Sequence, residues 1–147
     1  MINNSQKRGY EFEKYLYWLF QINDLSPRSS FRIVGEQIDG SFEYGNEVYL
    51  LEAKWTQNQT SKSDLVIFNE KVSSKSGFTR GVYISYAGYA LNAIDTLNNG
   101  RIVRIVLMSV QELVISFQRE LLFTDLLRGK VRALAEEGKS FKSIMEI

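Results

Sequence analysis

The chain has 147 residues, a length that suits one domain with a sizeable core, and its hydrophobic content of 44% is ordinary for a globular protein. Cysteine and histidine are absent, which excludes disulfides, thiolate or imidazole metal sites, and catalytic triads built on histidine. The formal net charge of +1 provides no bulk electrostatic case for nucleic-acid binding, so any such binding needs a local basic patch.

Membrane and export signals are not found in the sequence. No apolar run approaches the ~20 residues that a membrane-spanning helix requires. The N-terminal residues, Met-Ile-Asn-Asn-Ser-Gln-Lys-Arg, lack the apolar segment of a signal peptide. We therefore expect a cytoplasmic protein without a membrane partner.

The first predicted element is a helix that Ser5 caps and that reaches about Ile22. Its apolar residues recur at the i, i+3, i+4, i+7 and i+8 positions of one buried face, namely Phe12, Tyr15, Leu16, Leu19 and Phe20. Glu13 lies at the edge of this stripe, about one hundred degrees of helix turn from Phe12. Taken alone, Glu13 is an ordinary surface glutamate that pairs with Lys14 or Arg8.

A β-hairpin is predicted over residues 37–55, after a loop over 24–30 and a short strand over 31–35. Two apolar-rich runs flank Gly45-Asn46, a glycine-first pair suited to a two-residue type II′ turn. If Tyr44 pairs with Glu47 across this turn, Asp39 lies opposite Glu52 and Gln37 lies opposite Lys54.

The side chains of this hairpin separate into two faces because the period of a strand is two residues. One face is expected to meet a core and carries Ile38, Gly40, Phe42, Tyr44, Tyr49, Leu51, Ala53 and Trp55. The other face carries Gln37, Asp39, Ser41, Glu43, Val48, Leu50, Glu52 and Lys54. Opposed carboxylates repel each other, and Lys54 together with a hard divalent cation such as Mg²⁺ would offset that repulsion. The alternative is an ordinary solvated hairpin face with charge pairs.

The rest of the chain alternates helices and strands and then ends in helices. Asn98-Asn99-Gly100 is a helix stop, and Ser109 is a helix cap. Along the last helices, charged side chains are expected to form a solvated face: Arg128, Lys130, Arg132, Lys139, Glu136 and Glu137. The predicted elements are a helix that Ser61 or Ser63 caps and that reaches about Ser74, a strand over 81–86, a helix over 88–97, a strand over 101–108, a helix from 109 that carries Leu113, Phe117 and Leu121, a helix to about 137, and a short helix over 141–145.

Three segments resemble the motifs of a known nuclease superfamily: Gly9-Tyr10-Glu11-Phe12-Glu13, Ile38-Asp39-Gly40 and Glu52-Ala53-Lys54. The chain resembles the PD-(D/E)xK nucleases, particularly the Mrr-type restriction endonuclease branch. The resemblance covers about residues 8–108. It implies an α/β fold with a restriction-endonuclease-like core of helix, three strands, helix and strand, a mixed sheet, and a C-terminal helical extension over about 109–147. All 147 residues would form a single domain.

The resemblance also implies a reaction and roles for four residues. Asp39 and Glu52 would bind Mg²⁺, with Mn²⁺ as a substitute, and Glu13 would support the metal or its waters. Lys54 would orient the attacking water and stabilise charge on the phosphate. The reaction would be phosphodiester hydrolysis in DNA.

Two departures from the family pattern bear on specificity. Ile38 stands where the family often has proline before the first acid, and 147 residues leave no room for the usual recognition domain. A homodimer, a partner protein or loops would then supply specificity. Phosphate contacts are expected from basic side chains: Lys7, Arg8, Lys14, Arg28, Arg32, Lys62, Lys71, Lys75 and Arg80. Five aromatic residues are expected mostly in the core: Tyr15, Tyr17, Trp18, Tyr83 and Tyr86.

Two other functions remain open on the sequence. The first is a catalytically inactive module that keeps the nuclease fold and binds DNA or a partner protein. The second is an interaction domain in which the acidic hairpin is incidental. A structure in which Asp39 and Glu52 point to opposite faces would favour the last of these.

Overall fold

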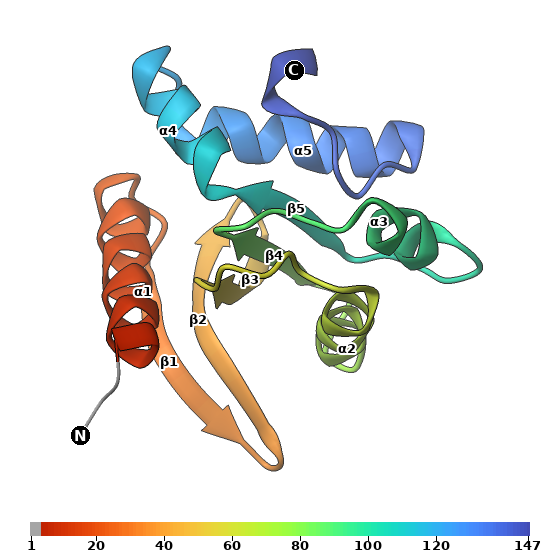
Figure 1. Ribbon diagram of the computed structural model, residues 1–147, viewed down its shortest axis with the longest axis horizontal. Helices are drawn as coiled ribbons and strands as arrows, with labels where there is room; N and C mark the ends of the chain where they lie inside the picture. Colours follow the sequence, from red (N-terminus) through yellow and green to blue (C-terminus); the bar gives the residue numbers. More distant parts are fainter. Residues whose placement is uncertain (1–3) are drawn as a thin grey trace.

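A computed structural model describes residues 4–147, and its elements follow the predicted order of a helix, three strands, a helix, a strand, a helix, a strand and helices (Figure 1). The elements are α1 (Asn4–Ile22), β1 (Arg28–Ile33), β2 (Glu36–Tyr44), β3 (Glu47–Lys54), α2 (Lys62–Ser73), β4 (Thr79–Ser85), α3 (Leu91–Asn98), β5 (Ile105–Ser109), α4 (Val110–Gln118), α5 (Phe123–Glu137) and the 3₁₀ turn η1 (Ile144–Glu146).

The strands form one mixed sheet in the order β1-β2-β3-β4-β5. The first three strands are antiparallel, and β4 and β5 continue the sheet in parallel with β3. Tyr44 pairs with Glu47 across a turn in which Gly45 has a φ of +62°, as the sequence predicted. The predicted mixed α/β architecture is therefore confirmed.

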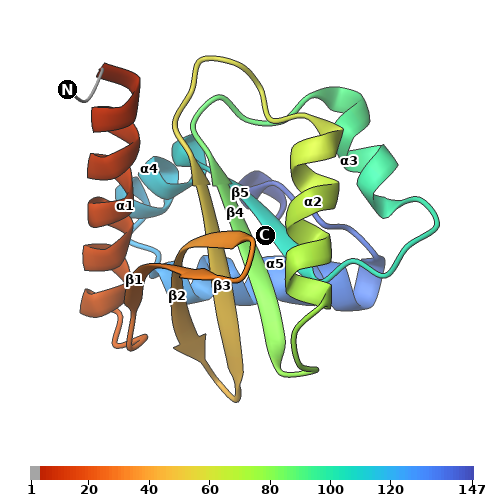
Figure 2. The same ribbon diagram turned by 90° about the horizontal axis from the view of Figure 1, so that it is seen from below.

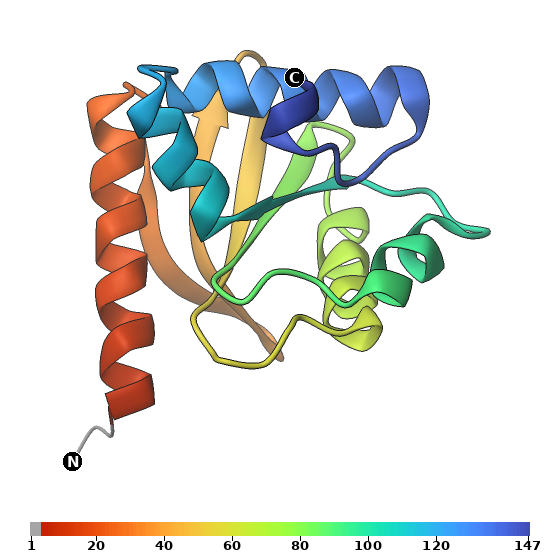
Figure 3. The ribbon, with the colours of Figure 1, turned by 45° about the horizontal axis from the view of Figure 1, so that its top comes forward.

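Helices cover both faces of the sheet, so the domain has three layers (Figure 1; Figure 3). On one face, α1, α4 and α5 pack on Phe42, Tyr49 and Leu51. On the other face, α2 and α3 pack on Leu50 and Leu107. The hairpin face predicted to be polar is thus partly covered by α2.

The first residues of β2 do not pair with β3 as predicted. Together with β1 they form a hairpin that extends beyond β3 and bends toward α2 (Figure 2). Its far end is tied there, because Lys75 pairs with Glu36 at 3.2 Å and Lys71 donates a hydrogen bond to the Gln37 carbonyl at 3.2 Å. As a result Ile38, predicted on the face of Phe42, is buried in the cluster that contains α2 instead.

Helix α1 buries a narrower stripe than the sequence indicated. Ser5 lies inside the helix, which already includes Asn4. Phe12, Leu16, Leu19 and Phe20 are buried, as predicted, but Tyr15 is 38% exposed. Three more aromatic residues expected in the core are also exposed: Tyr17, Trp18 and Tyr86. Only Tyr83 of the five aromatic residues predicted in the core is buried.

The largest error in the sequence-based interpretation concerns Lys130. It was expected on a solvated face, yet it is buried between α4 and α5, with its Nζ 2.8 and 2.7 Å from the two carboxylate oxygens of Glu112. Glu112 also accepts the N–H groups of Ser109 and Ile144, and the Lys130 ammonium lies 4.1 Å from the ring centroid of Phe141. Every polar group of this pair therefore has partners.

None of the helices within residues 4–147 is both long and apolar enough to cross a membrane.

Candidate active site

The four predicted site residues come from three elements: Glu13 from α1, Asp39 from β2, and Glu52 and Lys54 from β3. The regular pairing of β2 with β3 ends at Gly40 and Leu51, one residue before the predicted pair of acids. Beyond this point the Asp39 Oδ2 accepts the Ala53 N–H at 2.9 Å. Asp39 is thus held at β3 by a side-chain contact rather than as a ladder partner of Glu52.

The prediction that Gln37 lies opposite Lys54 is wrong. Gln37 pairs with Arg32 of β1, and the Arg32 guanidinium donates a hydrogen bond to its side chain at 3.0 Å. The cause is the bend of β2 toward α2, which separates the far end of this strand from β3.

Asp39 and Glu52 nevertheless act on each other. Burial raises the pKa of Glu52 to about 8, and the charge of Asp39 and a hydrogen bond with its carboxyl group add to the effect. Lys71 opposes the shift weakly, because its Nζ lies 3.7 Å from the Glu52 carboxylate. Burial and Asp39 therefore both favour the protonated form of Glu52.

Glu13 belongs to the same electrostatic group. Its side chain is half-buried on α1, and burial followed by the charge of Asp39 raises its pKa to about 7. Asp39 is thus the residue that couples the other two acids. The sequence placed Glu13 at the edge of the buried stripe, and the structure agrees.

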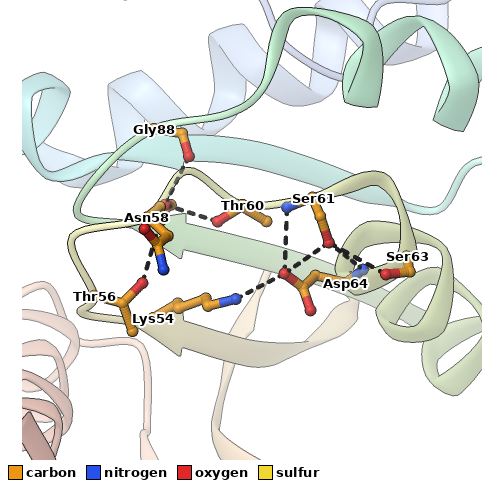
Figure 4. A network of polar contacts seen from close by, with 9 residues as sticks. Lys54, Thr56, Asn58, Thr60, Ser61, Ser63, Asp64 and Gly88 are labelled. Atoms are coloured by element: carbon orange, nitrogen blue, oxygen red, sulfur yellow. Dashed lines mark hydrogen bonds and ion pairs between the residues drawn. The ribbon is translucent and has the colours of Figure 1, made fainter.

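Lys54 is held by α2 (Figure 4). Its Nζ lies 2.7 Å from Asp64 Oδ2, and the same oxygen accepts hydrogen bonds from the Ser61 N–H at 3.2 Å and the Ser61 hydroxyl at 3.1 Å. Although partial burial acts in the opposite direction, the hydrogen bonds from Lys54 and Ser61 lower the pKa of Asp64. The ammonium group is therefore fixed at the amino-terminal end of α2.

Sequence reasoning missed Asp64 and Lys71 as members of the site. Asp64 had a readable signal, because Ser61-x-x-Asp64 has the spacing of a capping box, and the structure contains that box. Lys71 had been counted among the phosphate contacts. Its place beside Glu52 depends on how α2 packs on the sheet, which a linear pattern does not reveal.

A cleft of about 400 Å³ opens beside Glu13 and Asp39, between α1, β1 and β2. Lys14 and Arg28, two of the predicted phosphate contacts, line it. Gly40 lies in its wall, and a Cβ there would come within 3.1 Å of the Arg28 carbonyl, so glycine permits β1 to pass close to the site.

The other predicted phosphate contacts differ in their availability. Lys71, Lys75 and Arg80 are engaged in ion pairs with Glu52, Glu36 and Glu47. Three lie on exposed helical surface: Lys7, Arg8 and Lys62.

The donor set fits a hard cation. Within residues 4–147, no group of three or more acidic side chains is already gathered around a common metal position. The pair of Asp39 and Glu52 still offers carboxylate oxygens, the ligands that Mg²⁺ prefers, together with room for water ligands in the adjacent cleft. These two residues could hold a cation. Glu13 belongs to the same electrostatic group, because the charge of Asp39 contributes to its raised pKa.

Comparison with known sequences decides the family. The sequence model of the Mrr catalytic domain, described as a restriction endonuclease, matches residues 5–116. The chain belongs to the Mrr-type restriction endonuclease family. Among curated proteins, none matches this chain.

Two solved structures resemble this Mrr-type domain. A protein of unknown function, AF1548, aligns with a TM-score of 0.55 at 17% identity, over 68% of this chain and 57% of the other. The MspJI restriction endonuclease, solved in complex with a 27-mer oligonucleotide, aligns with a TM-score of 0.49 at 16% identity, over 76% of this chain and 28% of the other. The Mrr-type domain thus spans 57% and 28% of the lengths of these proteins.

Proposed function

We propose that this Mrr-type domain is a Mg²⁺-dependent endonuclease that hydrolyses phosphodiester bonds in DNA. The observation that carries the proposal is the position of Asp39 at β3, where its Oδ2 accepts the Ala53 N–H at 2.9 Å next to Glu52, whose pKa burial and the charge of Asp39 raise to about 8. Membership of a restriction endonuclease family supports the reaction class. Burial and the neighbouring Asp39 disfavour the ionised form of Glu52, and a divalent cation bound by the two acids would stabilise that form.

Asp39 and Glu52 would hold the cation, and Glu13 would support it or its water ligands. A Mg²⁺ ion bound there supplies Lewis acidity toward the phosphate and lowers the pKa of a water ligand, and Mn²⁺ would substitute for it. The Ala53 N–H holds Asp39 in place through its hydrogen bond of 2.9 Å. The site is therefore built on a strand rather than on a loop.

Lys54 would donate a hydrogen bond to the phosphate or to the attacking water, where negative charge develops. Its contact with Asp64 at 2.7 Å keeps the ammonium group at the end of β3 until substrate arrives. Lys14 and Arg28 in the cleft would bind phosphates of the same strand. These contacts position DNA but carry no sequence information, so a second copy or a partner protein would supply specificity.

A second candidate is a non-catalytic module that binds DNA or a partner protein. The observation that favours it is that Lys54 is paired with Asp64 and that no three acids in residues 4–147 are gathered for a metal. Calorimetry separates the two functions. If millimolar Mg²⁺ or Mn²⁺ neither binds nor raises the melting temperature while DNA still binds, the module is the correct description.

Plasmid cleavage tests the first proposal. Supercoiled plasmid is incubated with Mg²⁺ and the wild-type protein, the Asp39→Ala variant or the Lys54→Ala variant. We expect nicked or linear product with the wild type and none with either variant. Equal product in all three samples would show that any cleavage comes from a contaminant or from other residues.

A further inference from the structure

A second hollow, of about 350 Å³, lies between α1 and α4, and none of the four candidate active-site residues lines it. Phe12, Tyr15 and Trp55 present three aromatic rings to it, Val114 closes it from α4, and Arg8 and Glu11 stand along its α1 side. Its volume lies at the small end of the range for ligand sites, which suits one ring system rather than a large ligand.

Trp55 is the fixed wall of this hollow. Its ring is stacked on Tyr86, with centroids 4.2 Å apart and planes 13° from parallel, and it meets the ring of Phe12 nearly edge-on at 5.1 Å. Tyr86 does not line the hollow. Trp55 is only half-buried, so an indole held by two other rings still presents surface for stacking.

The hollow adjoins the candidate active site. Trp55 directly follows Lys54, and the Tyr86 N–H donates a hydrogen bond to the Lys54 carbonyl at 2.9 Å. Helix α1 lines both places, the cleft beside Asp39 from one flank and the hollow beside Trp55 from the other. The cleft takes Tyr10, Glu13, Lys14 and Tyr17, and the hollow takes Arg8, Glu11, Phe12 and Tyr15.

We propose that this hollow receives one unpaired nucleobase of the strand that is cut, stacked on Trp55, while Arg8 binds an adjoining phosphate. The inference rests on the proposed function, because it takes the DNA strand bound at Lys54 to be the one that is cut. Aromatic rings stack bases without regard to sequence, and an exposed arginine at the rim supplies charge complementary to a phosphate. The preferred substrate class is then DNA with unpaired bases, such as single strands, flaps or mismatched sites, because a paired base must first leave its stack.

Tryptophan fluorescence reports directly on binding at Trp55, because the chain has only two tryptophans. Trp18 is 48% exposed on α1, so Trp18→Phe keeps a ring there and leaves Trp55 as the sole reporter. The probes are an oligothymidylate about twelve nucleotides long and an abasic oligomer of the same length, both titrated without divalent cation. We expect the oligothymidylate to quench Trp55 and to bind about tenfold more tightly than the abasic oligomer.

A variant that fills the hollow tests the location without removing Trp55. Val114 is 49% exposed on α4, so Val114→Phe adds a ring from the opposite wall. It should abolish the preference for the oligothymidylate. The matched control is Leu91→Phe on α3, where the side chain is 94% exposed, and it should keep the preference.

Equal binding and quenching by the two oligomers would overturn the inference, as would an unchanged preference in Val114→Phe. If Val114→Phe instead alters the sedimentation of the protein and leaves the preference intact, the hollow is a contact surface between copies and the inference fails. Base preference without Mg²⁺-dependent cleavage would support the stacking site and contradict the nuclease. Cleavage without base preference would do the reverse.

Discussion

Carboxylates are buried or partly buried in two regions of this domain. In one region the carboxylate is paired with a cation, and in the other it lies beside a second acid. Between α4 and α5, Glu112 and Lys130 form a buried pair in which both carboxylate oxygens contact the ammonium group. At the hairpin, burial and the neighbouring Asp39 both disfavour the charged form of Glu52, and Lys71, 3.7 Å from the Glu52 carboxylate, opposes them. The first arrangement is complete without a ligand, whereas the second leaves repulsion that a ligand can relieve.

This contrast separates a structural ion pair from a candidate functional site. Burial lowers the pKa of Lys130, while Glu112 raises it again through its charge and its hydrogen bond. At the hairpin, burial and the neighbouring acid act in the same direction, and the pKa of Glu52 rises to about 8. Unrelieved strain of this kind is typical of sites that bind or react.

The largest expected effect is on activity at the hairpin. Asp39→Asn removes a charge from the carboxylate pair, so the cleavage rate should fall on the order of 10³-fold while the protein stays folded. Initial rates of plasmid nicking measure the loss, and circular dichroism verifies the fold. Asp95→Asn, an exposed acid on α3, is the matched control and should cleave at the wild-type rate. Wild-type activity in Asp39→Asn would remove this residue from the site.

The next effect is on stability at the buried pair. Lys130→Met leaves the Glu112 carboxylate buried without its cation, so the free energy of unfolding should fall by about 3–5 kcal/mol. Urea unfolding monitored by circular dichroism measures it. Glu112→Gln combined with Lys130→Met should recover part of the loss, because no unpaired charge remains.

The exposed pair of Arg132 and Glu136, 2.9 Å apart on α5, is the control for this experiment. Arg132→Met should leave the unfolding midpoint unchanged, since solvated ion pairs contribute little. Equal losses in Lys130→Met and Arg132→Met would contradict a special role for the buried pair.

A smaller effect concerns the pH dependence of stability without divalent cation. The pKa of Glu52 is about 8 in the folded protein against an ordinary value of 4.5, so between these pH values the folded state binds more protons than the unfolded state. Stability should therefore fall as the pH rises from about 4.5 to about 8. Glu52→Gln should flatten this dependence and be more stable by about 1–3 kcal/mol at pH 8 in EDTA.

Thermal melts at several pH values measure this dependence, and Mg²⁺ should raise the melting temperature of the wild type most at the alkaline end. Glu13, with a pKa of about 7, adds to the same trend in the same direction. Parallel pH profiles for wild type and Glu52→Gln would mean that Glu52 is not the group that titrates.

The smallest expected effect concerns the position of Lys54. Asp64→Asn weakens the contact that holds the ammonium group, so kcat should fall about tenfold with little change in KM. Ser61→Ala is the control, because it removes the hydroxyl that caps α2 and that donates to Asp64 but keeps the Asp64 carboxylate with its contacts to Lys54 and the backbone N–H of residue 61. The two variants should lose similar stability and differ in kcat. If Ser61→Ala lowers kcat as much as Asp64→Asn, Asp64 acts only through the helix cap.

Much of the fold was predictable because local chemistry specifies it. Gly45 adopts the positive φ that a glycine-first turn needs, and this turn sets the register of β2 and β3 as far as Gly40 and Leu51. Ser109 caps α4, as its sequence indicated, and Ser61, one of the two serines predicted as the cap, begins α2. The elements that carry Glu13, Asp39, Glu52 and Lys54 were also placed correctly, whereas the roles of these residues stay predictions.

The errors at Lys130 and Ile38 share one cause, which is contact between elements distant in the chain. Lys130 reads as a solvated lysine on α5 until the segment with Phe141 and Ile144 covers it. Ile38 follows the alternation of its strand until Lys71 and Lys75 hold the β1–β2 hairpin at α2.

The sequence by itself determined the order of elements and the hairpin turn, because turn chemistry and residue periodicity act within a few residues. Only the tertiary structure decided which acids remain without a full set of partners. Asp64 holds Lys54 and Glu112 holds Lys130, each across a gap that only packing closes. The carboxylates of Asp39 and Glu52 are left to repel each other, because burial and the distance to the nearest cation depend on how the layers pack.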